Sequence, residues 1–139
     1  MTTSANKLDY SNTDDKNILL LIKKSREGMK YVAFAGIQKQ LPLKVSDWSN
    51  ILHLSERTLQ RYKKEKINLS PIYSEKVLEI KLLFNKGIEV FGDVENFSQW
   101  LNSKNIALGG VKPVSLLDNT FGIMLLKDQL TRIEHGVLA

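Results

Sequence analysis

The residues whose types and spacing point most clearly to a chemistry are Arg57, Gln60, Arg61 and Lys64. Their intervals of three and four residues place them on one face of an α-helix. Arginine can donate two hydrogen bonds to guanine, glutamine can bond adenine, and lysine can neutralise a phosphate. This face therefore favours a helix that reads the major groove of DNA. An ordinary solvated charged face is the alternative.

The residues around this helix favour the same interpretation. Ser55 can cap its N-terminus, and the hydroxyls of Ser55 and Thr58 can bond phosphates there. We expect a short apolar helix before it, capped by Ser46 and running to about His53, with a tight turn between the two. Two short helices joined by a tight turn are typical of a helix-turn-helix unit.

The charge of the chain is unevenly distributed. Residues 1–92 carry 16 lysines and arginines against 10 acidic residues, a net charge of +6. Residues 93–139 carry four against five, a net charge of −1. The basic first part is compatible with nucleic-acid binding. The alternative is an ordinary lysine-rich solvated surface, which would have the same composition.

Catalysis has no comparable support. The two histidines, His53 and His135, lie far apart in the sequence, and neither has a carboxylate-rich neighbourhood. The absence of cysteine excludes disulfides, cysteine-ligated zinc and thiol chemistry. Metal-ligand spacings, a nucleophile elbow and a phosphate-binding loop are also missing. We expect a protein that is not an enzyme and that uses neither a metal nor a cofactor.

The hydropathy pattern gives no sign of a membrane protein. Residues 1–17 are polar and lack the basic start and apolar stretch of a signal peptide. The longest apolar run, residues 18–22, is far too short to span a bilayer. We expect a soluble cytoplasmic protein without a membrane partner.

Helix caps and breaks predict an all-α fold. The sustained alternation that indicates strands is missing. Residues 1–12 are expected to be disordered, and Thr13 can cap the first helix. Helices are expected over residues 14–27, 29–40, 46–53, 56–64, 71–91, 94–102, 114–118 and 120–134.

The helix over residues 71–91 is the longest, about 30 Å at 1.5 Å per residue. Leu78, Leu82 and Leu83 lie off its main apolar stripe, so the helix can pack on more than one side. We therefore expect it to join two halves of the molecule. The stripe itself consists of Tyr73, Val77, Ile80, Phe84, Ile88 and Phe91.

The last helix, residues 120–134, carries apolar residues on two opposite faces. One face suits the core, and the other needs the long helix, a second copy of the chain or a different protein, unless the single chain buries both. The first face consists of Ile123, Leu126, Leu130 and Ile133, and the second of Phe121, Met124 and Leu125.

Glycines stand on both sides of this helix. Gly109 and Gly110 allow positive φ and close backbone approach, and they fit a packed turn better than a phosphate-binding loop. Pro113 can start the short helix after that turn. Gly136 can end the last helix, and residues 137–139 are small or apolar enough to dock on a partner.

A series of short motifs follows in order along residues 46–139. They are Leu54-Ser55-Glu56-Arg57-Thr58-Leu59-Gln60-Arg61, Leu69-Ser70-Pro71, Glu89-Val90-Phe91-Gly92-Asp93, Trp100-Leu101, Ala107-Leu108-Gly109-Gly110, Pro113, Leu116-Leu117, Gly122, Leu130, Arg132-Ile133 and His135-Gly136-Val137. No single motif is specific, but in their order and spacing they resemble the Xre/MbcA/ParS-type antitoxins of bacterial toxin–antitoxin systems.

The resemblance implies an Xre-like helix-turn-helix domain over residues 13–68, a connecting helix over 69–92 and a toxin-binding domain over 93–139. It implies a RES-domain toxin partner that consumes NAD or uses it for ADP-ribosylation, with the antitoxin's C-terminal end covering the toxin's active site. It also implies operator binding for autoregulation, often as a homodimer.

The resemblance and the two faces above together define the expected site residues. DNA binding is expected of Ser55, Arg57, Thr58, Gln60, Arg61 and Lys64. Toxin binding is expected of Gly109, Gly110, Pro113, Phe121, Met124, Leu125, Arg132, Gly136, Val137, Leu138 and Ala139. Family members often carry more arginine where this chain has Tyr62-Lys63-Lys64 and Asn102-Ser103-Lys104, which bears on DNA affinity and operator sequence. The competing interpretation is a free-standing transcription regulator whose C-terminal module only dimerises.

Overall fold

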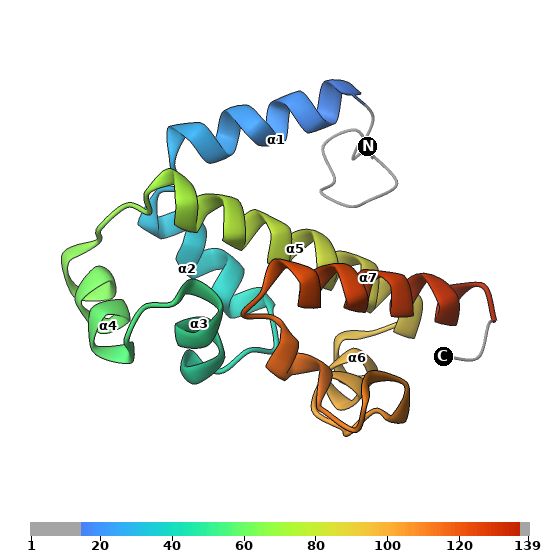
Figure 1. Ribbon diagram of the computed structural model, residues 1–139. Helices are drawn as coiled ribbons and strands as arrows, with labels where there is room; N and C mark the ends of the chain where they lie inside the picture. Colours follow the sequence, from blue (N-terminus) through green and yellow to red (C-terminus); the bar gives the residue numbers. More distant parts are fainter. Residues whose placement is uncertain (1–14, 137–139) are drawn as a thin grey trace.

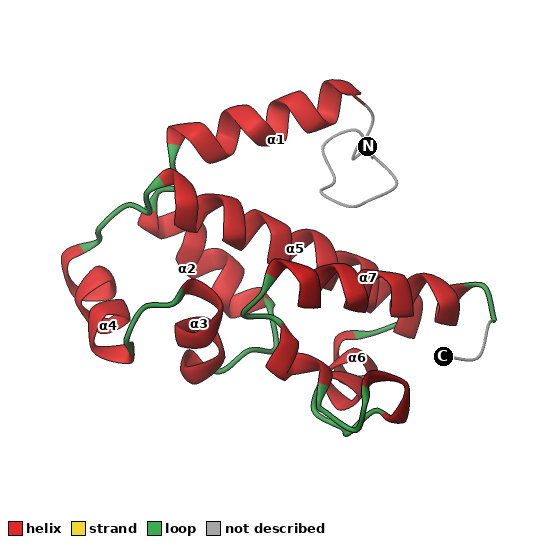
Figure 2. Ribbon diagram, in the orientation of Figure 1, coloured by secondary structure: helices red, strands yellow, loops and turns green. Residues whose placement is uncertain are grey.

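A computed structural model describes residues 15–136, and this part of the chain contains helices and no strands. The expected all-α fold is therefore confirmed (Figures 1 and 2). The disorder expected for residues 1–12, the cap expected at Thr13 and residues 137–139 lie outside the described part. The helices are α1 (Asp15–Glu27), α2 (Tyr31–Gln40), α3 (Val45–Leu52), α4 (Glu56–Glu65), α5 (Pro71–Phe91), α6 (Val94–Leu101) and α7 (Thr120–Glu134), with the 3-10 helices η3 (Ile106–Leu108) and η4 (Pro113–Leu116) between α6 and α7.

Helix α5 is the centre of the fold, and α1, α3, α6 and α7 pack against it. It joins the N-terminal helix-turn-helix part to the small C-terminal helical part, as expected (Figure 1). The two parts share one hydrophobic core, which runs from Trp48 through Phe84 to Leu126. Leu83 lies off the predicted apolar stripe but is completely buried, because helices cover several sides of α5.

Helix α6 approaches α5 closely because residue 87 has no side chain. The ring of Phe97 lies in T-shaped contact with Phe84, with 5.1 Å between their centroids, and it stacks on Trp100. A β-carbon on Gly87 would lie 2.2 Å from this ring. Gly87 is therefore required by packing, since its φ is not positive.

Some helix starts differ from the sequence prediction. Lys44, and not Ser46, is the N-cap of α3, because the Asp47 carboxylate accepts a 2.9 Å hydrogen bond from the Lys44 N–H. Helix α2 begins at Tyr31, since the N–H of Met29 is bonded to the distant hydroxyl of Ser74. The short helix expected over residues 114–118 is a 3-10 turn that begins at Pro113.

Candidate functional site

The turn between α3 and α4 is held by local hydrogen bonds. His53 adopts the left-handed conformation with a φ of 55°, which ends α3 and reverses the chain. The N–H of Leu54 donates to the Ser49 carbonyl at 3.1 Å. Ser55 caps α4 as predicted, with its Oγ accepting from the Thr58 N–H at 3.0 Å. Each of these bonds fixes the angle at which α4 leaves α3.

Helix α4 presents its basic residues to solvent. Leu59 is buried and Tyr62 is half-buried, so these two residues attach the helix to the core. The remaining surface exposes the predicted DNA-binding set Arg57, Gln60, Arg61 and Lys64, which we call the α4 basic face. At the start of the same helix, Ser55 is exposed and Thr58 is half-buried, and their hydroxyls bond each other at 2.9 Å.

Positive charge is concentrated around this face. Residues 30–66 carry eight lysines and arginines against three acidic residues, a net charge of +5 that equals the net charge of the whole chain. None of the ion pairs between described residues involves this segment. The guanidinium of Arg61 lies 5.5 Å from the centre of the Tyr62 ring, which supports its orientation.

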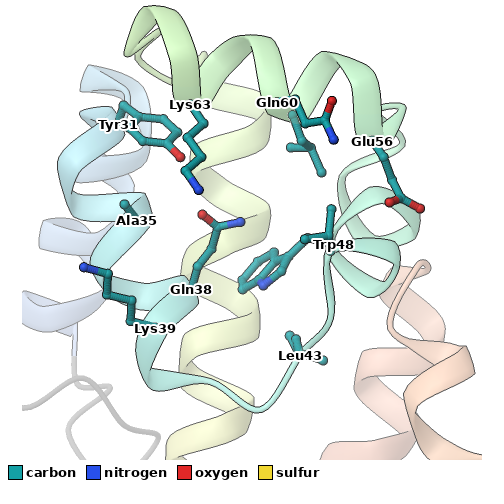
Figure 3. A pocket seen from close by; sticks show the side chains of 11 residues that line it. Tyr31, Ala35, Gln38, Lys39, Leu43, Trp48, Glu56, Gln60 and Lys63 are labelled. Carbon is teal, nitrogen blue, oxygen red and sulfur yellow. The ribbon is translucent and has the colours of Figure 1, made fainter.

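A cavity of about 450 Å³ lies between α2, α3 and α4. No local pattern of residues predicts it, because its walls come from three helices. Figure 3 shows Gln38, Trp48 and Lys63 extending toward its centre. Gln60 of the α4 basic face also lines the cavity. The cavity therefore borders the basic face, and its charged lining residues are Lys39, Glu56 and Lys63.

Helix α7 has the two faces that its sequence predicts. Ile123, Leu126 and Leu130 are buried in the core, and Ile133 is half-buried. The opposite face, which we call the α7 outer face, leaves Phe121 78%, Met124 56% and Leu125 42% exposed. Within residues 15–136, the second face is not buried, so the outer face is available to a partner.

The start of α7 is held against the rest of the molecule. Asn119 caps it by accepting from the Phe121 N–H at 2.8 Å. A ring nitrogen of His53 lies 2.9 Å from the Asp118 carbonyl oxygen, so the turn before α4 contacts the residue before the α7 cap. The Lys76 ammonium donates to the Thr120 hydroxyl at 3.1 Å. The α7 outer face is therefore presented on a fixed helix.

The end of α7 is attached to α5 by an ion pair between Lys86 and Glu134. The hydrogen bond from Lys86 lowers the pKa of the Glu134 carboxyl below its usual value, with a partly opposing contribution from desolvation. Glu134 is exposed, so solvent screens the pair and its main effect is on orientation.

The remaining predicted toxin-binding residues occupy different environments. Gly109 and Gly110 form an exposed turn with φ values of 79° and 84°, and a β-carbon at either would touch nothing, so the backbone conformation is the reason for glycine. Pro113 is buried and can only shape the surface. Arg132 and Gly136 are exposed at the end of α7, and Val137, Leu138 and Ala139 lie outside the described residues.

Within residues 15–136, no group of three or more His, Asp or Glu side chains is placed to hold a metal ion. In the same range, no helix is both long and apolar enough to cross a membrane.

Comparison with known proteins gives two family matches. Residues 20–80 match the antitoxin Xre-like helix-turn-helix domain, and residues 86–136 match the antitoxin Xre/MbcA/ParS C-terminal toxin-binding domain. An antitoxin Xre of Photorhabdus laumondii subsp. laumondii is 25% identical over 113 residues, which cover 75% of this chain and 76% of the relative.

The fold is also similar to that of a chain in the crystal structure of the M. tuberculosis MbcT–MbcA toxin–antitoxin complex. The TM-score is 0.59 at 18% sequence identity, and the match covers 76% of this chain and 93% of the other. At this identity the likeness concerns the fold alone.

Proposed function

The chain belongs to the Xre/MbcA/ParS antitoxin family, and from this we propose that it is the antitoxin of a type II toxin–antitoxin system. The observation that carries the proposal is the α7 outer face. Three large apolar side chains stand exposed on a helix that is fixed at both ends, inside the segment that matches the toxin-binding domain. Such a patch is typical of a protein–protein interface.

The proposed partner is a RES-domain toxin that consumes NAD or uses it for ADP-ribosylation. In this proposal the α7 outer face contacts the toxin, and Arg132, Gly136 and residues 137–139 extend into its active site and exclude the substrate. The chain itself performs no catalysis and acts in the cytoplasm. The turn at Gly109 and Gly110 and the buried Pro113 shape the surface next to α6.

Deletion of residues 137–139 tests the occlusion step. Cells that express the toxin should lose most of their protection when the antitoxin lacks these three residues, because the active site would stay open. The readout is growth after toxin induction, with antitoxin levels checked by immunoblot. Deletion of residues 2–4 is a control of equal size and should protect fully. Full protection by the C-terminal deletion would show that occlusion by the tail is wrong.

We also propose that the α4 basic face binds operator DNA and that the protein represses its own operon as a homodimer. The support is the net charge of +5 within residues 30–66 and the exposure of Arg57, Gln60, Arg61 and Lys64 on the second helix of a helix-turn-helix. Ser55 and Thr58 stand at the N-terminus of that helix, where backbone N–H groups favour phosphate.

Substitution of Arg57→Ala or Arg61→Ala should each weaken operator binding by about 1–3 kcal/mol if the arginine reads a guanine. Fluorescence anisotropy with the upstream region of its own reading frame, at constant salt, measures the effect. Lys104→Ala removes an exposed cation from the C-terminal half and should have little effect. Equal affinities for all three variants and the wild type would mean that the basic face is only solvated surface.

The competing function is a free-standing transcription regulator whose C-terminal module only dimerises. The mass of the purified protein after co-expression with the adjacent gene distinguishes the antitoxin from the free-standing regulator. A complex that contains both gene products supports the antitoxin, and a homodimer alone supports the regulator.

A further inference from the structure

The cavity between α2, α3 and α4 has the size and the lining of a small-molecule site. Its volume of about 450 Å³ lies within the range of about 300–1,000 Å³ that ligand pockets have. Most of its lining residues are apolar or aromatic, with a few polar groups among them. Because the buried residues Trp48 and Leu59 form part of the wall, the cavity reaches down to the hydrophobic core.

Several hydrogen-bond donors around this cavity have no acceptor. The Nε1–H of Trp48 is buried and finds no acceptor among the described residues. In the same part of the chain, the Tyr31 hydroxyl, the Gln38 amide and the Lys63 ammonium make no hydrogen bond or ion pair. Burial raises the pKa of the Tyr31 hydroxyl, so this group stays protonated and can donate. A buried donor without an acceptor costs free energy, so these groups favour a ligand that brings acceptor oxygens.

The charges around the cavity favour a negative ligand. Lys39 and Lys63 line it against a single acidic residue, Glu56. Figure 3 shows Gln38 and Lys63 directed into the cavity, whereas Glu56 lies on the side away from Lys63 and points outward. All of these residues belong to the segment 30–66, which has a net charge of +5. Such a positive environment attracts anions and disfavours cations.

We propose that this cavity binds a small molecule with a flat apolar body and one anionic group, such as an aromatic carboxylate. The apolar body contacts the ring of Trp48 and the side chain of Leu59. The anionic group accepts hydrogen bonds from Lys63, Gln38 and the Tyr31 hydroxyl. A purely apolar ligand would leave these donors unpaired, and a small inorganic anion would leave the apolar wall in water. Both parts of the ligand are therefore needed.

The position of the cavity gives its ligand a route to DNA binding. Gln60 belongs to the α4 basic face and also lines the cavity. A bound anion adds negative charge beside this face and opposes the approach of phosphates. The ligand should therefore lower the affinity for operator DNA. This regulatory effect rests on the proposed function, whereas the binding of the ligand does not.

Fluorescence titration of the full chain with anilinonaphthalene sulfonate (ANS) tests the ligand site. Phenylnaphthylamine has the same rings without the sulfonate and serves as the neutral probe. The wild type should bind ANS saturably and more tightly than the neutral probe. Lys63→Gln should weaken ANS about 5-fold, as the loss of one partly solvated ion pair does, and should leave the neutral probe unaffected. Lys64→Gln is the matched control, because Lys64 is the next exposed lysine of α4 and does not line the cavity.

Two further variants locate the bound probe. Ala35→Phe places a ring inside the cavity and should abolish the binding of both probes, with circular dichroism as the check on folding. Phe121→Ala removes an exposed ring of the α7 outer face and should leave ANS binding unchanged. The ligand site is wrong if ANS does not saturate, if Lys63→Gln and Lys64→Gln have equal effects, if folded Ala35→Phe still binds, or if Phe121→Ala removes binding. If Ala35→Phe does not fold, the comparison of Lys63→Gln with Lys64→Gln decides.

A mobility-shift assay with the operator tests the regulatory effect. Saturating ANS should lower the operator affinity of the wild type by about 5-fold and should have no effect on Ala35→Phe. Unchanged operator affinity of the ANS-bound wild type would show that the regulatory effect is wrong. A protein that does not bind the operator even without ANS would contradict the proposed DNA function, and the titrations above would still decide the ligand site.

Discussion

Substitution of Gly122 by alanine is expected to destabilise the protein by about 3 kcal/mol, as an overpacked contact in a close-packed interior does. A β-carbon at this position would lie 2.0 Å from the Leu116 carbonyl oxygen and 2.9 Å from its carbonyl carbon. A backbone group cannot rotate away as a flexible side chain can. The clash is therefore relieved only if η4 and the start of α7 move apart. This movement removes contacts around the buried Leu117 and Ile123.

Thermal unfolding measures this effect. The midpoint should fall by roughly 10 °C for a chain of this size. Gly36→Ala is a matched control, because Gly36 lies in α2 with open space around its α-carbon. There alanine should stabilise the protein by about 0.5–1 kcal/mol through helix propensity and a less flexible unfolded chain. An equal change in the unfolding midpoint of Gly122→Ala and Gly36→Ala would mean that the contact of η4 with α7 does not constrain residue 122.

The double variant Phe121→Ala/Met124→Ala is expected to weaken binding of the toxin by about 3–4 kcal/mol, a few hundred-fold in dissociation constant. Large side chains at the centre of an interface carry most of its binding energy, and these two are the most exposed apolar residues of α7. Because both side chains are exposed, they contribute little to the stability of the unbound protein. Its unfolding midpoint should therefore hardly change.

Isothermal titration with the product of the adjacent reading frame measures this binding. Val32→Ala truncates a side chain of similar exposure on α2 and should bind like the wild type. Unchanged affinity of the double variant would place the toxin interface elsewhere, with the exposed Ile106 of η3 as the next residue to test. Loss of binding together with a lowered midpoint would instead indicate a structural role for Phe121 or Met124.

The helices follow from local signals that are strong in this chain. Ser55 caps α4, Pro71 starts α5, and Gly92 ends α5 with a φ of 90°. Each of these residues acts on its own neighbours, so the sequence is sufficient to predict the effect. The N-cap of α3 differs because the Asp47 carboxylate is the stronger acceptor and moves the cap from Ser46 to Lys44.

The sequence also predicts which residues form the α4 basic face and the α7 outer face. The period of 3.6 residues places Arg57 and Arg61 together on α4, and it separates Phe121 from Leu126 on α7. Their exposure depends on what packs against each helix. The sequence therefore left open whether the second face of α7 was buried, and the tertiary structure shows it exposed.

The sequence by itself determined the helices, most of their ends and the chemical character of each face, because these depend on residues within a few positions of one another. Only the tertiary structure decided which faces remain open and how the parts are joined. The contact of His53 with Asp118 spans 65 positions, and Gly122 must remain glycine because η4 lies against it. Such contacts depend on the packing of helices around α5, which no local spacing of residues records.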